Sequence, residues 1–235
     1  MVYNCTHWLQ TLLFPLRCRL CDAAVGSGLN LCPACRAELP WLGAHCARCA
    51  RPLPAAHPER HCGRCQQRPP AFDAATALFH YRPPVDHLIR RLKFSHELGL
   101  SPLLAGLLAE RLTTRHTPLP ELLIPVPLHR ARLRERGFNQ ATELARRLGR
   151  TLGVRHAPQM CTRHRNTRPQ SLLPVTARRL NLRNAFSITG RLPAAHVAII
   201  DDVMTSGHTS DELARTLKRA GAEYVEIWVV ARAGR

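Results

Sequence analysis

The segment from residue 197 to residue 209 constrains the fold of this chain more than any other. It begins with four apolar residues in a row (197–200), continues with Asp201 and Asp202, and passes through a hydroxyl-rich loop into a polar stretch. An apolar run without alternation is typical of a parallel strand covered on both faces. We expect a helix over residues 210–220, so the order strand, loop, helix predicts an α/β fold with both acids at the carboxyl end of a buried strand.

The acids and the loop can together hold a phosphorylated sugar. Open α/β sheets bind ligands at the carboxyl ends of their strands, where carboxylates can accept hydrogen bonds from neighbouring ribose hydroxyls. The loop offers backbone N–H groups, hydroxyls and a permissive glycine, and the next helix points its positive end at a bound phosphate. The loop residues are Thr205, Ser206, Gly207, His208 and Thr209. The alternative is an ordinary strand–turn–helix unit with solvated acids, which is costly without a ligand or donors.

Composition indicates a globular protein with an anionic partner. The 235 residues allow one large domain or two smaller ones, and 45% hydrophobic residues can supply a core. There are 34 basic and 16 acidic residues, hence +18, and residues 121–190 hold 14 Arg and 3 acids, hence +11. This charge favours nucleic acid or pyrophosphate as partners, although codon preference is an alternative source of the Arg excess. Because no apolar run approaches the roughly 20 residues of a membrane span, we expect no membrane insertion and a cytoplasmic protein.

Eight of the ten cysteines occur as Cys-x-x-Cys pairs in the N-terminal third of the chain. In a reducing compartment this repeat favours metal over disulfides, and two such pairs complete one tetrahedral zinc site. The simplest assignment is sequential, with a cross-braced pairing and redox-active or disulfide-bonded pairs as alternatives. The first site would then hold Cys18, Cys21, Cys32 and Cys35, and the second Cys46, Cys49, Cys62 and Cys65. We therefore expect two structural Zn²⁺ ions.

A domain boundary is predicted at the Arg-Pro-Pro run of residues 68–70. An N-terminal lead-in and a double zinc ribbon would occupy residues 1–69, and a larger α/β domain residues 70–235. In the second part, apolar runs predict strands and three- or four-residue apolar spacing predicts helices. The expected strands are 74–81 and 122–126, and the expected helices are 85–94, 98–112 and 139–152. Their alternation indicates a parallel sheet flanked by helices.

Two basic segments follow the strand expected at residues 122–126. The first, which we expect to be a loop, can neutralise a pyrophosphate and ends in a glycine suited to a tight turn, with a solvated basic helix face as the alternative. Its residues are Arg130, Arg132, Arg134, Arg136 and Gly137. The second can close over a ligand as a flexible lid that excludes water, with a plain surface loop as the alternative. Its candidate residues are Arg163, Arg165, Thr167 and Gln170.

Residues 201–209 resemble the phosphoribosyl pyrophosphate (PRPP) signature of type I phosphoribosyltransferases, and the whole chain resembles the ComF/GntX family. The family resemblance adds the zinc ribbon, the Pro-Val-Pro-Leu of residues 125–128 and the Arg-Gly-Phe-Asn-Gln of residues 136–140. It implies a type I phosphoribosyltransferase-like sheet, PRPP bound with Mg²⁺, and a link to DNA uptake in natural competence. By this analogy Asp201 and Asp202 hold the ribose, residues 205–209 the 5′-phosphate, and residues 130–136 the pyrophosphate.

Three functions fit this combination of motifs. The first is a phosphoribosyltransferase with an unidentified acceptor; its catalytic residues are unknown, and Lys93 is a candidate base that could equally be structural or pair with phosphate. The second is a competence factor that binds single-stranded DNA mainly through phosphate contacts, with PRPP as a regulator, although aromatic residues for base stacking are sparse. A helicase or another component of DNA uptake is a further possible partner. The third is a protein that senses PRPP without transferring its phosphoribosyl group.

Overall fold

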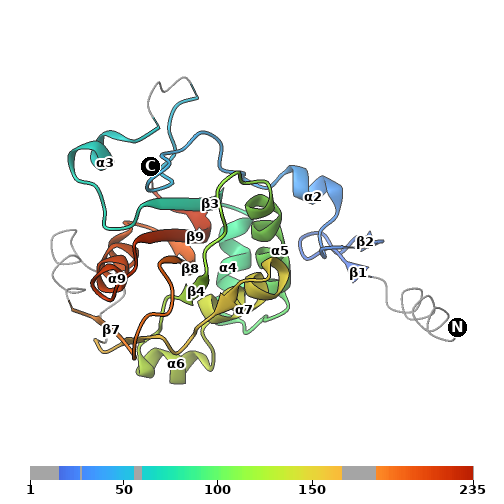
Figure 1. Ribbon diagram of the computed structural model, residues 1–235. Coiled ribbons are helices and arrows are strands. Elements are labelled where there is room, and N and C mark those ends of the chain that lie inside the picture. Colours follow the sequence, from blue (N-terminus) through green and yellow to red (C-terminus); the bar gives the residue numbers. More distant parts are fainter. Residues whose placement is uncertain (1–15, 27, 56–59, 166–183, 235) are drawn as a thin grey trace, which may run out of the picture.

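The computed structural model describes residues 16–26, 28–55, 60–165 and 184–234. At its centre is a five-stranded sheet with the order β3-β9-β8-β4-β5, in which every pair of neighbours is parallel (Figure 1). Its strands are β3 (Ala74–His80), β4 (Leu122–Pro125), β5 (Arg155–His156), β8 (His196–Met204) and β9 (Tyr224–Arg232). The main helices are α4 (Val85–Phe94), α5 (Leu100–Thr113), α7 (Gln140–Leu152) and α9 (His208–Arg219). The predicted parallel sheet flanked by helices is confirmed.

The apolar run of β8 is explained by two separate hydrophobic cores, one on each face of the sheet. Val197 and Ile199 belong to the core on the α9 side, whereas Ala198 and Ile200 belong to the core beneath α4, α5 and α7. Successive residues of a strand point to opposite faces, so a strand covered on both sides needs apolar residues at every position.

The helix α5 is buried on several sides at once. It packs on α7 and the sheet, and Leu29 of the N-terminal region lies so close to Gly106 that a side chain there would collide with it. A helix that is apolar all round is typical of such an enclosed position. Among the described residues, no helix is long and apolar enough to cross a membrane.

The N-terminal region forms two small cysteine modules that lie against different parts of the sheet domain (Figure 1). The first module, residues 16–39, contains β1 (Leu16–Arg17), β2 (Ala24–Val25) and α2 (Pro33–Ala37) and packs into the core beside α5. The second module, residues 45–68, contains α3 (Gly63–Gln67), and its cysteines share a core with residues of β8, β9 and α9. The boundary after residue 69 remains a prediction, because both modules are packed on the body.

Three features differ from the expectations. The strand β8 extends past residue 200 to Met204, so the two acids lie within the strand rather than after it. The basic segment after β4 forms a helix, α6 (Arg130–Arg136), rather than a loop. The strand β9 was not among the expected elements, although its run of β-branched and aromatic residues is typical of a strand. A small hairpin pairs β6 (Cys161–Arg163) with β7 (Phe186–Ile188).

Candidate ribose-phosphate site and zinc centres

The two acids of β8 lie where the sheet opens. The pairing of β8 with β4 ends at Ile200 opposite Pro125, but its pairing with β9 continues to Met204. Within the described residues, the last four residues of β8 therefore have a neighbouring strand on one side only. We call this half-paired end of β8, residues 201–204, the notch; open α/β sheets bind ligands near the carboxyl ends of such strands.

Asp202 is held by a lysine from α4. It is 2% exposed, and its Oδ2 lies 2.6 Å from Nζ of Lys93. The strand period places Asp202 on the same face as Ala198 and Ile200, which is the face that α4 covers. The Oδ1 atom accepts a hydrogen bond from the backbone N–H of Val203 at 2.9 Å. Lys93 therefore supplies the counter-charge that a buried carboxylate requires.

The neighbouring carboxyl, Asp201, is in a different electrostatic state. Burial and the adjacent charge of Asp202 raise the pKa of Asp201 to about 8, despite the opposing field of Lys93. Burial also acts to raise the pKa of Asp202, but the charge and hydrogen bond of Lys93 outweigh it and lower that pKa. In the ligand-free chain, the pair thus carries about one negative charge at neutral pH. Hydroxyl donors or a cation at the notch would favour loss of the second proton.

Two arginines extend the positive environment of the acid pair. The guanidinium of Arg136 stacks over the ring of Phe94 at 5.3 Å and donates to Oε1 of Gln140 at 2.7 Å. Burial is the largest influence on the pKa of Arg136 and Arg163, and it lowers the pKa of each guanidinium. The charge of Asp201 acts in the opposite direction on both. Lys93 of α4 therefore contacts the acid pair directly, whereas Arg136 of α6 and Arg163 of β6 interact with it electrostatically.

The four arginines of α6 do not form a single cluster. Arg132 and Arg136 are half-buried, one helical turn apart, and line a pocket together with Lys93. Arg130 and Arg134 are exposed, because residues four apart share one face of a helix and the two pairs alternate. The helix ends at Gly137, which has the left-handed φ of 74° that a tight turn needs.

The hydroxyl-rich loop connects β8 directly to α9. Gly207 has φ 80° and precedes the first helical residue, His208, whose N–H approaches Oγ of Ser206 at 3.5 Å. Thr205 is exposed, and Ser206, His208 and Thr209 are half-buried. Because α9 begins at His208, two residues earlier than expected, the N–H groups of its first turn begin within the predicted loop itself.

Of the four predicted lid residues, the structure describes two. Arg163 lies in β6, with its guanidinium over the ring of Phe186 at 5.8 Å, and belongs to the surroundings of Asp201. Arg165 is exposed just beyond β6. Thr167 and Gln170 lie outside the described residues.

The cysteines form two tetrads with the predicted sequential pairing. Cys18, Cys21, Cys32 and Cys35 form one, and Cys46, Cys49, Cys62 and Cys65 the other, with the sulfur atoms of each within 4.8 Å of one another. Cys21 and Cys32, and likewise Cys49 and Cys62, place their sulfurs 3.7 Å apart. Tetrahedral zinc with Zn–S distances of about 2.3 Å gives sulfur separations of about 3.8 Å, so both tetrads fit Zn²⁺.

Comparison with known proteins agrees with this architecture. Residues 9–66 match the family described as "Double zinc ribbon domain". The chain is 36% identical over 219 residues to the "DNA utilization protein YhgH" of Salmonella typhi, covering 92% of this chain and 89% of that protein. It is 34% identical over 228 residues to "Competence protein F" of Haemophilus influenzae, covering 94% and 98%.

Among solved structures, a purine phosphoribosyltransferase from Pyrococcus horikoshii aligns weakly, with a TM-score of 0.32 and 17% identity over 67% of this chain and 87% of that one. The relatives are more informative, because about a third of the residues are identical across almost the full length of both chains. Together with the double zinc ribbon, these matches show that the chain belongs to the ComF/YhgH family.

Proposed function

We propose that the chain binds PRPP and transfers its phosphoribosyl group to an acceptor that is still to be identified. The observation that carries the proposal is the continuity of the acid pair with the loop. Asp201 and Asp202, which would hold the ribose hydroxyls, are followed within one strand end by the hydroxyls and helix N-terminus that would hold the 5′-phosphate. The ribose and the 5′-phosphate of one ligand would thus bind to adjacent parts of one motif.

The pyrophosphate of PRPP would lie against Lys93, Arg132 and Arg136. These side chains line one pocket, and two of them belong to a helix that follows the end of the neighbouring strand β4. Guanidinium groups bind phosphate oxygens in a bidentate manner, which suits a leaving group that gains charge. Mg²⁺ would neutralise further charge on the pyrophosphate, and Asp201 and Asp202 are the carboxylates at the notch that would hold it or its waters.

Transfer would separate the pyrophosphate from C1 of the ribose and leave a cation-like sugar for the acceptor to attack. The charged carboxylate of Asp202 would stabilise positive charge nearby, and Arg163 on β6 would help close the site from water. Lys93 is less suited to act as a general base, because its pKa is raised: burial is the largest single influence and lowers the pKa, but the charge and hydrogen bond of Asp202, with the charge of Asp201, together outweigh it. A base supplied by the acceptor would fit this arrangement better.

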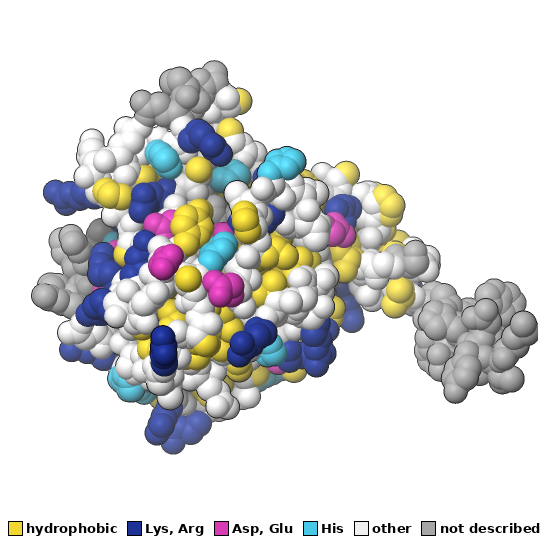
Figure 2. Space-filling view, in the orientation of Figure 1, with side chains coloured by type: hydrophobic (Ala, Val, Ile, Leu, Met, Phe, Trp, Pro, Cys, Tyr) yellow, Lys and Arg dark blue, Asp and Glu magenta, His cyan; other side chains and the backbone are white. Residues whose placement is uncertain are grey.

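We place this activity in DNA uptake or use, in the cytoplasm. The relatives are called competence and DNA utilization proteins, and the sequence carries an excess of basic residues. Lys and Arg side chains gather on the side of the molecule where α6 and α9 lie (Figure 2). The exposed Arg130, Arg134 and Arg165 favour a second candidate function, in which the protein binds single-stranded DNA and PRPP only regulates it.

Binding of PRPP is tested by thermal unfolding with and without PRPP and Mg²⁺. Because the ligand binds only the folded state, we expect it to raise the free energy of unfolding by about 2.7 kcal/mol at a ligand concentration of about 100 times Kd. The melting temperature should rise accordingly. Asp201→Asn combined with Asp202→Asn should abolish the shift. The control Asp22→Asn removes an exposed carboxylate remote from the site and should keep the shift. An unchanged melting temperature in the wild-type protein would refute the proposal.

Transfer is separated from sensing by measuring release of pyrophosphate from PRPP. The acceptors to screen are nucleobases, nucleosides and oligonucleotides. The variant Asp201→Asn with Asp202→Asn serves as the negative control for each. Release that depends on one class of acceptor would identify the substrate. Binding of PRPP without release for any acceptor would favour a sensor, and DNA binding whose log affinity falls linearly with log salt would favour the second candidate function.

A further inference from the structure

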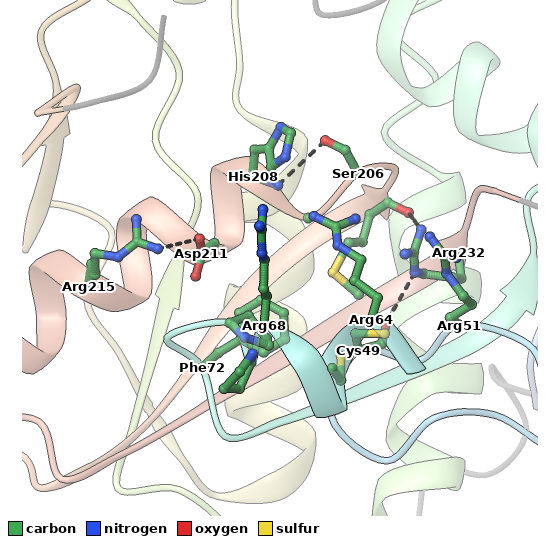
Figure 3. Close-up of a pocket in the computed structure, with 15 residues that line it drawn as sticks. Cys49, Arg51, Arg64, Arg68, Phe72, Ser206, His208, Asp211, Arg215 and Arg232 are labelled. Carbon is green, nitrogen blue, oxygen red and sulfur yellow. Dashed lines mark hydrogen bonds and ion pairs between the residues drawn. The ribbon is translucent and has the colours of Figure 1, made fainter. Parts of the chain in front are cut away.

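A second basic pocket lies between the zinc-binding N-terminal region and the loop after β8 (Figure 3). Its volume is about 210 Å³, several times the roughly 30 Å³ that a water molecule occupies in the liquid. One wall is formed by Arg51, Arg64 and Arg68 of the second module, and another by Ser206 and His208 of the loop. This pocket shares no lining residue with the pocket of Lys93, Arg132 and Arg136.

Arginines outnumber carboxylates in the lining of this pocket, which also includes two cysteines of the second tetrad. Among the described residues, Asp211 is its only acidic lining residue. Asp211 already accepts a hydrogen bond from the backbone N–H of Ala71 at 2.6 Å and another from Arg215 at 2.6 Å. In the part of the chain that the structure describes, no carboxylate forms an ion pair with Arg51, Arg64 or Arg68. Like charges gathered in a pocket favour a bound anion.

The arginines of α3 are directed at the loop. Arg64 and Arg68 lie four residues apart, at the beginning and just past the end of this short helix, and their side chains extend from the zinc module toward Ser206 and His208 (Figure 3). The guanidinium groups and the N-terminus of α9 therefore approach the same space from opposite sides. A phosphate between them would accept hydrogen bonds from both.

A buried arginine holds the zinc module and the loop together. Arg232 at the end of β9 is 4% exposed, and its Nε donates to the carbonyl oxygen of Cys49 at 3.0 Å. Its Nη1 donates to the carbonyl oxygen of Met204 at 2.9 Å and also to that of Thr205. One guanidinium thus fixes a zinc-binding turn against the first residue of the loop.

We propose that the second zinc module completes the 5′-phosphate site, with Arg64 and Arg68 as direct ligands of the phosphate. The inference rests on the proposed function, because it assigns the same loop to the same phosphate. A phosphomonoester carries about −1.5 to −2 charges at neutral pH, and residues 205–209 contain no lysine or arginine. The zinc module supplies the missing cations, so each end of the phosphoribosyl ligand has arginines of its own.

The test compares three ligands by calorimetry: ribose 5-phosphate, PRPP and pyrophosphate. In the variant Arg64→Gln with Arg68→Gln, we expect the affinity for ribose 5-phosphate and PRPP to fall by the same factor, roughly tenfold for each arginine removed. The affinity for pyrophosphate should stay unchanged, because it binds at the other pocket. The control Arg60→Gln with Arg111→Gln removes the same charge from another pocket, which shares no lining residue with this one, and should change no affinity more than about twofold.

The outcomes separate this inference from the proposed function. If the wild-type protein binds neither ribose 5-phosphate nor PRPP, the proposed function fails and this inference fails with it. If the wild type binds both and the double variant binds them as the control does, only the role of the zinc module is overturned. Zinc content and circular dichroism check folding; should the double variant lose zinc, the single substitutions at Arg64 and Arg68 decide the question, since each predicts a roughly tenfold loss.

Discussion

At the scale of single residues, Asp201 makes the stability of the protein depend on pH. Its folded-state pKa is raised to about 8 by burial and by Asp202, from the usual 3.8. The folded chain therefore binds this proton more tightly than the unfolded chain, and stability falls as pH rises from about 4 through about 8. In the ligand-free protein the cost of the Asp201 charge is fully present above that range.

Asp201→Asn should remove this dependence. We expect a higher melting temperature for the variant at pH 8.5, by roughly 2–4 °C for each kcal/mol of repulsion removed, and little change at pH 5, where Asp201 is already protonated. Thermal unfolding of the variant and the wild-type protein at the two pH values measures both changes in melting temperature. Asp202→Asn is the matched comparison and should lower the melting temperature at both values, because it leaves Lys93 buried without its partner. A variant at Asp201 that is equally destabilised at every pH would contradict this account.

At the scale of the elements, the sequence predicts those helices and strands whose apolar pattern matches the way in which they are buried. The helices α4 and α7 follow their apolar spacing, and β4 and the first half of β8 follow runs that are apolar at every position. The second half of β8 could not be predicted in this way, because Asp201 and Asp202 look like the end of a strand. They continue it because β9, distant in sequence, pairs with them there.

The same limit explains which candidate residues can be predicted from the sequence. The acids, the loop and Arg136 belong to contiguous motifs, whereas the arginines of α3 and Arg232 meet the loop only through the packing of the zinc module. The segment that forms α6 could be predicted from the sequence only in part. Its Arg at every second position predicts a basic region, but the helical period is needed to explain why Arg132 and Arg136 line a pocket with Lys93 while Arg130 and Arg134 are exposed.

The turn between β8 and α9 gives a prediction at this scale. Gly207→Ala should destabilise the fold by about 1–2 kcal/mol, because φ 80° places an alanine in the left-handed region. Its side chain would have room, since the nearest atom would be Met204 Sδ at 3.6 Å. Ribose 5-phosphate binding should fall further than this strain explains, because the loop N–H groups would turn. Gly153→Ala, with φ 69° at the end of α7, imposes the same strain away from the site and should leave binding intact in calorimetry.

At the scale of the whole molecule, the two zinc modules contribute to different parts of the structure. The first packs beside α5, and Arg36 of this module forms an ion pair with Glu110 at 2.6 Å. The second shares its core with β8, β9 and α9 and is joined to the loop by Arg232. Metal binding supplies folding free energy to such small modules, so loss of each metal should affect a different property.

We expect two zinc ions per chain in the wild-type protein, and one per chain in either cysteine variant. Cys18→Ser with Cys21→Ser should lower the melting temperature while ribose 5-phosphate still binds, because the first module touches no part of the loop pocket. Cys46→Ser with Cys49→Ser should weaken that binding at least as much as the loss of Arg64 and Arg68, because the whole wall of the pocket is released. Elemental analysis with calorimetry below both melting temperatures measures this. Equal loss of binding in the two variants would mean that zinc acts on the fold as a whole rather than on the phosphate site through the second module.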